Sequence, residues 1–71
     1  MNAKTVSVEW LNKAAASIEA AAAESLPTWI LLGQAARYSE DMGKAAALRR
    51  AATIKSVAER REFLRSNGVS A

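Results

Sequence analysis

The sequence predicts an all-α protein of three helices, folded as a helical hairpin or small bundle. Alanine, the strongest helix former, supplies 17 of the 71 residues. Larger apolar side chains recur at spacings of three and four residues, and no segment alternates apolar and polar residues as a half-buried strand would. One proline and three glycines divide the chain. We therefore expect helices at about residues 8–25, 27–39 and 40–67.

The first expected helix has a start signal and one apolar stripe. The hydroxyl of Thr5 or Ser7 is suited to cap it, and Glu9 favours the positive end of the helix dipole. A seam that alternates large residues with alanine allows two helix axes to approach closely, for example in antiparallel packing against a like helix. Alanine is also simply a good helix former. The stripe predicts a self-association seam made of Leu11, Ala14, Ala15, Ile18, Ala21 and Ala22.

Pro27 is expected to end the first helix, because its ring disfavours helical geometry at Leu26 and it has no amide hydrogen to donate. It fits the first turn of the second helix instead. Residues 29–32 (Trp-Ile-Leu-Leu) form the one consecutive run of large apolar side chains, and they point in all directions around a helix. We therefore expect the start of the second helix to be buried on most sides, with Trp29 in the core.

The segment from Ser39 to Gly43 predicts a joint between the second and third helices. Ser39 is a suitable cap, and the acidic Glu40 and Asp41 favour the start of a new helix. The alternative is a single helix over residues 28–67, kinked near Gly43.

The end of the last helix has a clear signal in Asn67-Gly68. Glycine readily takes the left-handed conformation that follows a final helical turn. Val69 is then placed to fold back onto Phe63 or Leu64, as the hydrophobic contact of that motif requires.

The chain is long enough for one small domain, residues 1–71, with residues 1–6 and 69–71 frayed. Its hydrophobic content of 51% includes all 17 alanines, so large core residues are few. The chain has no cysteine for a disulfide, and neither cysteine nor histidine to hold zinc. A small chain with so sparse a core is commonly stabilised by sharing it with another subunit, and we expect a homodimer to complete the bundle.

The residue types present argue against an enzyme. The absence of histidine and cysteine removes the commonest acid–base group and the strongest nucleophile. The three glycines are isolated, so no phosphate-binding loop is formed. Glu59 and Glu62 share a helical face, but the neighbouring arginines favour solvated ion pairs over a metal site. We expect no catalytic residue, no metal and no cofactor.

Positive charge is concentrated in the second half of the chain, which predicts an anionic partner as one possibility. Residues 1–41 have a net charge of −2 and residues 42–71 a net charge of +5. The alternative function is therefore a small DNA- or RNA-binding regulator that uses a helix over about residues 44–65. Its cations fall into three groups around such a helix, however, whereas a helix in a major groove would gather them on one side.

The favoured function is that of a non-catalytic module, an adaptor or inhibitor-type regulator that binds a partner protein stoichiometrically. Aromatic and arginine side chains dominate interface energetics, and a chain this small cannot bury all of them. Trp10 lies off the apolar stripe and is the best candidate for an exposed anchor, although it can also pack on the second helix. No stretch approaches the ~20 apolar residues that span a bilayer, so we expect a cytoplasmic protein that does not bind membranes. The expected partner-binding residues are Trp10, Trp29, Tyr38, Arg49, Arg50, Arg60 and Arg61.

Overall fold

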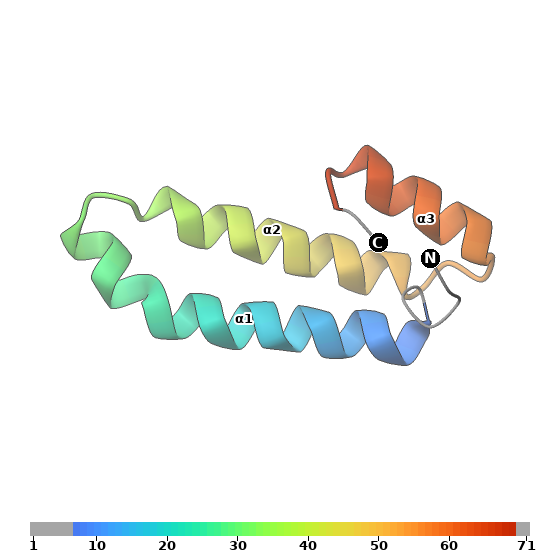
Figure 1. Ribbon diagram of the computed structural model, residues 1–71, viewed down its shortest axis with the longest axis horizontal. Coiled ribbons are helices and arrows are strands. Elements are labelled where there is room, and N and C mark those ends of the chain that lie inside the picture. Colours follow the sequence, from blue (N-terminus) through green and yellow to red (C-terminus); the bar gives the residue numbers. More distant parts are fainter. Residues whose placement is uncertain (1–6, 70–71) are drawn as a thin grey trace.

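A computed structural model describes residues 7–69 and contains three helices: α1 (Val8–Leu31), α2 (Ala36–Ala51) and α3 (Val57–Ser66). Helices α1 and α2 run antiparallel as a long hairpin, and the shorter α3 packs at the end of the hairpin where α1 begins (Figure 1). The molecule is elongated, measuring 41 × 20 × 20 Å. No strand occurs between residues 7 and 69, so the predicted all-α class is confirmed. The boundaries of the helices, however, differ from the expected ones.

Pro27 lies inside α1, and the prediction that it ends the first helix is wrong. Pro27 has no amide hydrogen, so the carbonyl of Ala23, four residues earlier, lacks its helical hydrogen bond. Both residues are exposed, so water can hydrate that carbonyl. The proline is thus on the solvent side of a helix that curves toward α2 at this end (Figure 1). Proline in a helix interior costs about 3 kcal/mol. Leu26 and Trp29, on either side of the proline, are both half-buried, which favours continuing the helix past it.

The first helix ends instead at a glycine that the sequence analysis did not identify as a stop. Gly33 has a φ of 69°, the left-handed conformation that follows a final turn. Its amide donates to the carbonyl of Ile30 at 3.2 Å, and the amide of Gln34 donates to the carbonyl of Trp29 at 2.7 Å. These two hydrogen bonds define a Schellman motif. The expected second helix over residues 27–39 is therefore wrong, since its beginning belongs to α1 and its end to α2.

The expected joint between Ser39 and Gly43 is also wrong, because this segment is the middle of α2. Ser39, Glu40 and Gly43 are exposed there. A helix-interior glycine costs only about 1 kcal/mol relative to alanine, which the packing of α2 on α1 outweighs.

A real break occurs ten residues later, so the expected continuous helix over residues 40–67 is wrong. Helix α2 ends at Ala51, and the hydroxyl of Thr53 donates to the carbonyl of Arg50 at 2.7 Å. The hydroxyl of Ser56 then caps α3 by accepting from the amide of Glu59 at 3.4 Å. Side-chain hydrogen bonds thus compete with the helical backbone at both ends of the linker.

The predicted cap at the start of the first helix and the predicted stop at Asn67-Gly68 are both confirmed. Ser7 caps α1 by accepting from the amide of Trp10 at 3.1 Å, whereas Thr5 lies outside the described residues. At the end of α3, Gly68 has a φ of 74° and the amide of Val69 donates to the carbonyl of Leu64 at 2.8 Å. Val69, which we expected to fray, is half-buried against the core cluster that contains Leu64. The rest of the expected frayed ends, residues 1–6 and 70–71, lies outside the described part of the chain.

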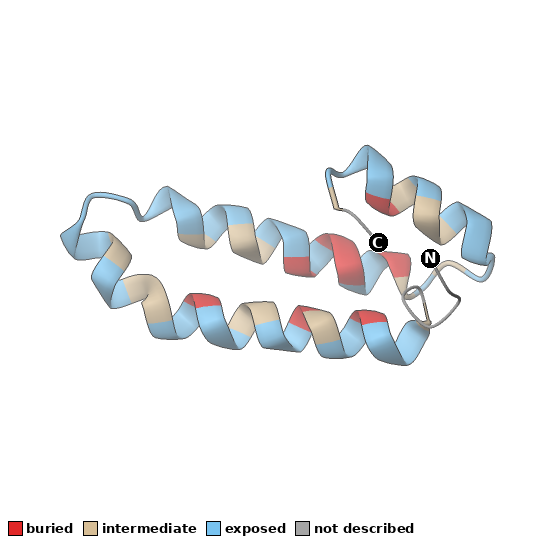
Figure 2. Cartoon of the chain, in the orientation of Figure 1, coloured by how far each residue is buried: buried red, intermediate tan, exposed pale blue. Residues whose placement is uncertain are grey.

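The two long helices meet along a seam with a spacing of three and four residues on each side. Figure 2 shows the buried residues on the facing sides of α1 and α2, mostly toward the end where α3 packs. Alanines alternate with larger side chains along this seam, which permits close approach of the two helices at the alanine positions. The buried or half-buried seam residues of α1 include Leu11, Ala15, Ile18, Ala22 and Trp29, and those of α2 include Tyr38, Asp41, Ala45, Leu48 and Ala52.

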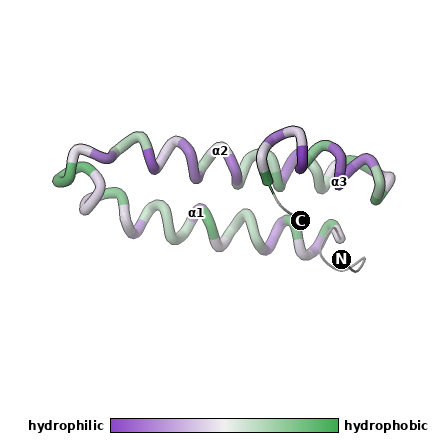
Figure 3. The backbone as a smooth tube through the Cα atoms, turned by 45° about the horizontal axis from the view of Figure 1, so that its top comes forward, coloured by the Kyte–Doolittle hydropathy of each residue, from purple (hydrophilic) through white to green (hydrophobic). Residues whose placement is uncertain are grey.

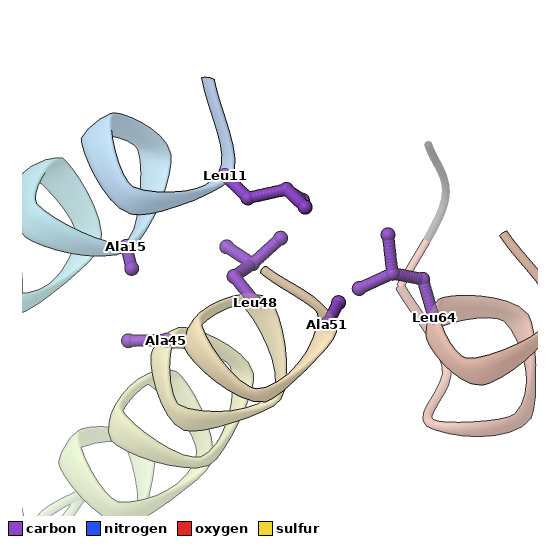
Figure 4. Packing of buried hydrophobic residues seen from close by; sticks show 6 residues of the cluster. All are labelled: Leu11, Ala15, Ala45, Leu48, Ala51 and Leu64. Atoms are coloured by element: carbon purple, nitrogen blue, oxygen red, sulfur yellow. The ribbon is translucent and has the colours of Figure 1, made fainter. Parts of the chain in front are cut away.

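The core is small and is concentrated at one end. Leu11 of α1, Leu48 of α2 and Leu64 of α3 converge there, with Ala51 between α2 and α3 (Figure 4). Within residues 7–69, the buried hydrophobic residues are three leucines and five alanines. Because burying a leucine contributes about 1.5–3 kcal/mol and burying a methyl group less, the three leucines dominate the hydrophobic stabilisation.

Candidate docking surface

The large apolar side chains with the highest exposed fractions lie at the hairpin tip, which we define as residues 29–34. Ile30 is 59% exposed, Leu31 87% and Leu32 63%. Figure 3 shows hydrophobic residues at the end of α1 where the chain turns toward α2, whereas hydrophilic and hydrophobic residues alternate along α2 and α3. The expectation that residues 29–32 are buried on most sides is therefore wrong for three of the four. Trp29 is half-buried rather than enclosed in the core.

Helix geometry explains why one of these side chains is half-covered and the other three are not. Trp29 lies seven residues after Ala22, and hence on the face of α1 that packs on α2. Ile30 and Leu31 are turned by about 100° and 200° away from that face, and Leu32 follows the last helical residue. The facing start of α2 offers only the small side chains of Ala35 and Ala36, which cannot cover them. The tip is thus an apolar knob at the convex end of the hairpin.

The composition of the tip favours contact with an apolar surface. No charged residue occurs from Ser25 to Ala36, and Arg37 is the first one after the turn. The exposed fractions of Ile30, Leu31 and Leu32 together equal about two whole side chains. Covering them would therefore contribute about 3–6 kcal/mol before the costs of association.

A second exposed apolar area lies at the opposite end of α1. Trp10 is 39% exposed and Val8 43%, so Trp10 is placed at the surface. An open hollow of about 260 Å³ beside it is lined by Trp10, Lys13, Ala14 and Ser17, and we call this the Trp10 hollow. A neighbouring hollow of about 310 Å³ shares Trp10 and Lys13 and adds Ser7 and Glu9. Trp29 follows Trp10 by 19 positions, so the two tryptophans are about 29 Å apart along α1 and cannot belong to one small site.

Arg49, an expected partner-binding residue, is bound within the chain. The Nε–H group of Arg49 donates a hydrogen bond to Oε2 of Glu19 at 3.0 Å, and its Nη2–H group donates one to Oε1. This bidentate ion pair joins α2 to α1. The hydrogen bond from Arg49 lowers the pKa of Glu19; desolvation opposes this shift, and charge attraction supports it. The same hydrogen bond raises the pKa of Arg49. The pair links α1 and α2 at a position that depends on the register of the hairpin.

Two other arginines also make contacts within the chain. Arg60 donates Nε to the carbonyl of Ile54 at 2.5 Å and Nη2 to the carbonyl of Lys55 at 3.5 Å, and so holds the linker between α2 and α3. Arg65 pairs with Glu62 at 3.5 Å on the exposed face of α3.

The remaining predicted partner-binding residues are distributed over different faces. Arg50 is exposed near the end of α2, and Arg61 is half-buried, with a buried Nε that has no hydrogen-bond partner. Tyr38 is half-buried on the α2 seam, near the tip in sequence but on the face toward α1. The helix expected to carry the basic residues from 44 to 65 is interrupted, because α2 ends at Ala51 and α3 begins at Val57. The structure does not gather these residues into one site.

The predicted self-association seam is used inside the chain. Leu11, Ala15 and Ala22 are buried, and Ala14 and Ile18 are half-buried against the core. Ala21 is exposed. The antiparallel partner of this seam is α2 of the same chain, so its buried residues Leu11, Ala15 and Ala22 are not open to contact with a second copy.

Two sequence signals for these features were present and were missed. Leu32-Gly33 follows an apolar helix in the same way as Asn67-Gly68, and it marks the end of α1 just after the apolar run. Ser56-Val-Ala-Glu59 has the spacing of a capping box, and it marks the start of α3. The Gly33 signal predicts that α1 ends just after the apolar run, at the tip. The Ser56 signal predicts that the basic segment is interrupted before α3.

No protein-family model, curated protein or solved structure matches this chain. Among the described residues, none of the helices has the length and apolarity needed to cross a bilayer.

Proposed function

We propose that the protein is a non-catalytic binding module that docks the hairpin tip into an apolar groove of a partner protein. The observation that carries this proposal is the run of Ile30, Leu31 and Leu32, which are 59%, 87% and 63% exposed at the convex end of the hairpin. Contiguous exposed apolar side chains are costly in water and typically mark an interaction site.

The type of partner follows from the shape and charge of the tip. A convex knob is best covered by a concave surface, as when an amphipathic helix lies in a hydrophobic groove. The absence of charge between Ser25 and Ala36 suits an apolar lining better than an anionic nucleic acid. Internal pairing of Arg49 with Glu19, and of Arg60 with linker carbonyls, further reduces the cations available to phosphates.

Affinity capture with the immobilised protein tests this proposal. Three proteins are compared, each with and without nuclease treatment of the lysate: the wild type, Leu31→Ser at the tip, and Ala46→Ser at an exposed position of α2. We expect a defined protein to bind the wild type and Ala46→Ser, to survive nuclease and to be lost with Leu31→Ser. Capture that disappears with nuclease would support the nucleic-acid alternative, and capture that Leu31→Ser leaves intact would exclude the tip.

A further inference from the structure

The elongated molecule has an apolar knob at one end and an apolar-lined hollow near the other. The hairpin tip includes the last turn of α1, at one end of the molecule in Figure 1, whereas the residues that line the Trp10 hollow belong to the first turns of α1. The 21 residues from Trp10 to Leu31 correspond to about 31 Å along the helix. A tip therefore cannot reach the hollow of its own chain.

We propose that the tip of one copy inserts into the Trp10 hollow of a second copy, in a head-to-tail contact. This inference rests on the proposed role of the tip as a docking surface, and it names a second copy as an occupant that competes with the partner protein. The two contact surfaces of each copy differ, so association continues past the dimer into short chains or a ring.

The size and lining of the hollow suit the side chains of the tip. The roughly 260 Å³ of open space beside Trp10 leaves room for an inserted leucine side chain. The indole of Trp10 and the methyl group of Ala14 offer apolar contact, while the stem of Lys13 can lie along an inserted side chain with its charge in water. Glu9 and Lys13 carry opposite charges beside Trp10, so little net charge opposes an apolar guest.

The area of the tip argues against a tip-to-tip dimer. Even at the ~150–250 Å² that a large aromatic side chain buries, two side chains' worth amounts to about 300–500 Å² per copy. A standard stable interface needs about 800 Å² per partner, and two convex knobs would bury less than their full area. The open Trp10 hollow lets an inserted side chain touch the flanking Trp10 and Ala14 side chains, a contact that a second convex knob does not offer. The contact remains small, so we expect weak, reversible association with a dissociation constant of about 0.1–1 mM.

Two surface variants, mixed in solution, test the contact. Leu31→Glu blocks the tip and leaves the hollow intact, whereas Ser17→Arg blocks the hollow and leaves the tip intact. Leu31 and Ser17 are both exposed, so neither change removes a core contact. Ala46→Glu on α2 and Ala16→Arg on α1 are controls that add the same charges at exposed positions outside both surfaces.

Sedimentation equilibrium over about 0.02–2 mM measures the average mass. The wild type and both controls should rise past the mass of a dimer, each blocked variant alone should remain a monomer, and the equimolar mixture should form dimers and stop there. A tip-to-tip contact would instead let Ser17→Arg dimerise alone. That result, or a wild type that stays monomeric, or a mixture that stays monomeric, would overturn the proposal. None of these outcomes affects the capture test above, which depends on Leu31 alone.

Discussion

Replacing Leu11 and Leu31 by alanine, one at a time, compares a core and a tip residue within the same helix. Leu11 is 0% exposed and converges with Leu48 and Leu64 (Figure 4), whereas Leu31 is 87% exposed. A buried Leu→Ala change costs about 2–5 kcal/mol, and an exposed one usually less than about 0.5 kcal/mol. The two variants should therefore differ by at least ~1.5 kcal/mol in the free energy of unfolding.

The scale of this difference makes the experiment decisive. A chain of this length has a total stability of about 4–10 kcal/mol, so Leu11→Ala should remove a large part of it. Urea unfolding followed by circular dichroism at low micromolar concentration measures both variants. With a slope near 1 kcal/mol per molar urea, the midpoint of Leu11→Ala should fall by ~2 M or more, and that of Leu31→Ala should stay almost unchanged. Equal losses would show that the tip is covered in the folded protein, and would refute the placement of residues 30–32 at the surface.

Three further predictions concern the hairpin. Because its ion pair with Arg49 lowers the pKa of Glu19, the stability it contributes is present above the usual titration range of a glutamate and is lost as the pH falls through the lowered value. Glu19→Gln should therefore flatten the loss of stability between about pH 5 and pH 2. Gly33→Ala should destabilise by about 1–2 kcal/mol because its φ is 69°, whereas Gly43→Ala, in a helix with space for a Cβ, should stabilise by about 0.5–1 kcal/mol. Pro27→Ala should raise the free energy of unfolding by up to about 3 kcal/mol, because it restores a hydrogen bond inside α1.

Thermal and urea unfolding of the same variants supply the contrary outcomes. A pH profile of Glu19→Gln that matches the wild type would mean that the ion pair with Arg49 does not form in solution. Equal effects of alanine at Gly33 and Gly43 would place the turn elsewhere. A neutral or destabilising Pro27→Ala would support a helix that ends before the proline, as the sequence alone suggested.

Local signals predicted the ends of the structure better than its middle. Ser7 and Asn67-Gly68 were identified correctly, because capping depends on a few neighbouring residues. Pro27 and Gly43 were given too much weight, because propensity is a weak guide where two helices pack along their full length. The seam on α1 continues from Leu11 past the proline to Trp29, and this long-range pattern outweighed the local one.

The candidate site was recognised as a segment but not as a surface. Residues 29–32 stood out in the sequence, and burial was expected because apolar runs are usually covered. Their exposure depends on where α1 ends, and the turn at Gly33 leaves its last residues without a neighbour. The pairing of Arg49 with Glu19 joins residues 30 positions apart and depends on the register of the hairpin, which no local pattern encodes.

The most direct test of the docking surface is the affinity of a captured partner for the wild type and for Leu31→Ser, measured by titration calorimetry alongside the urea midpoints of both proteins. Removing an almost fully exposed leucine that becomes buried on binding should cost about 2 kcal/mol, or roughly a 30-fold loss of affinity, with an unchanged midpoint. Equal affinities for the two proteins would contradict the assignment of the hairpin tip as the binding surface.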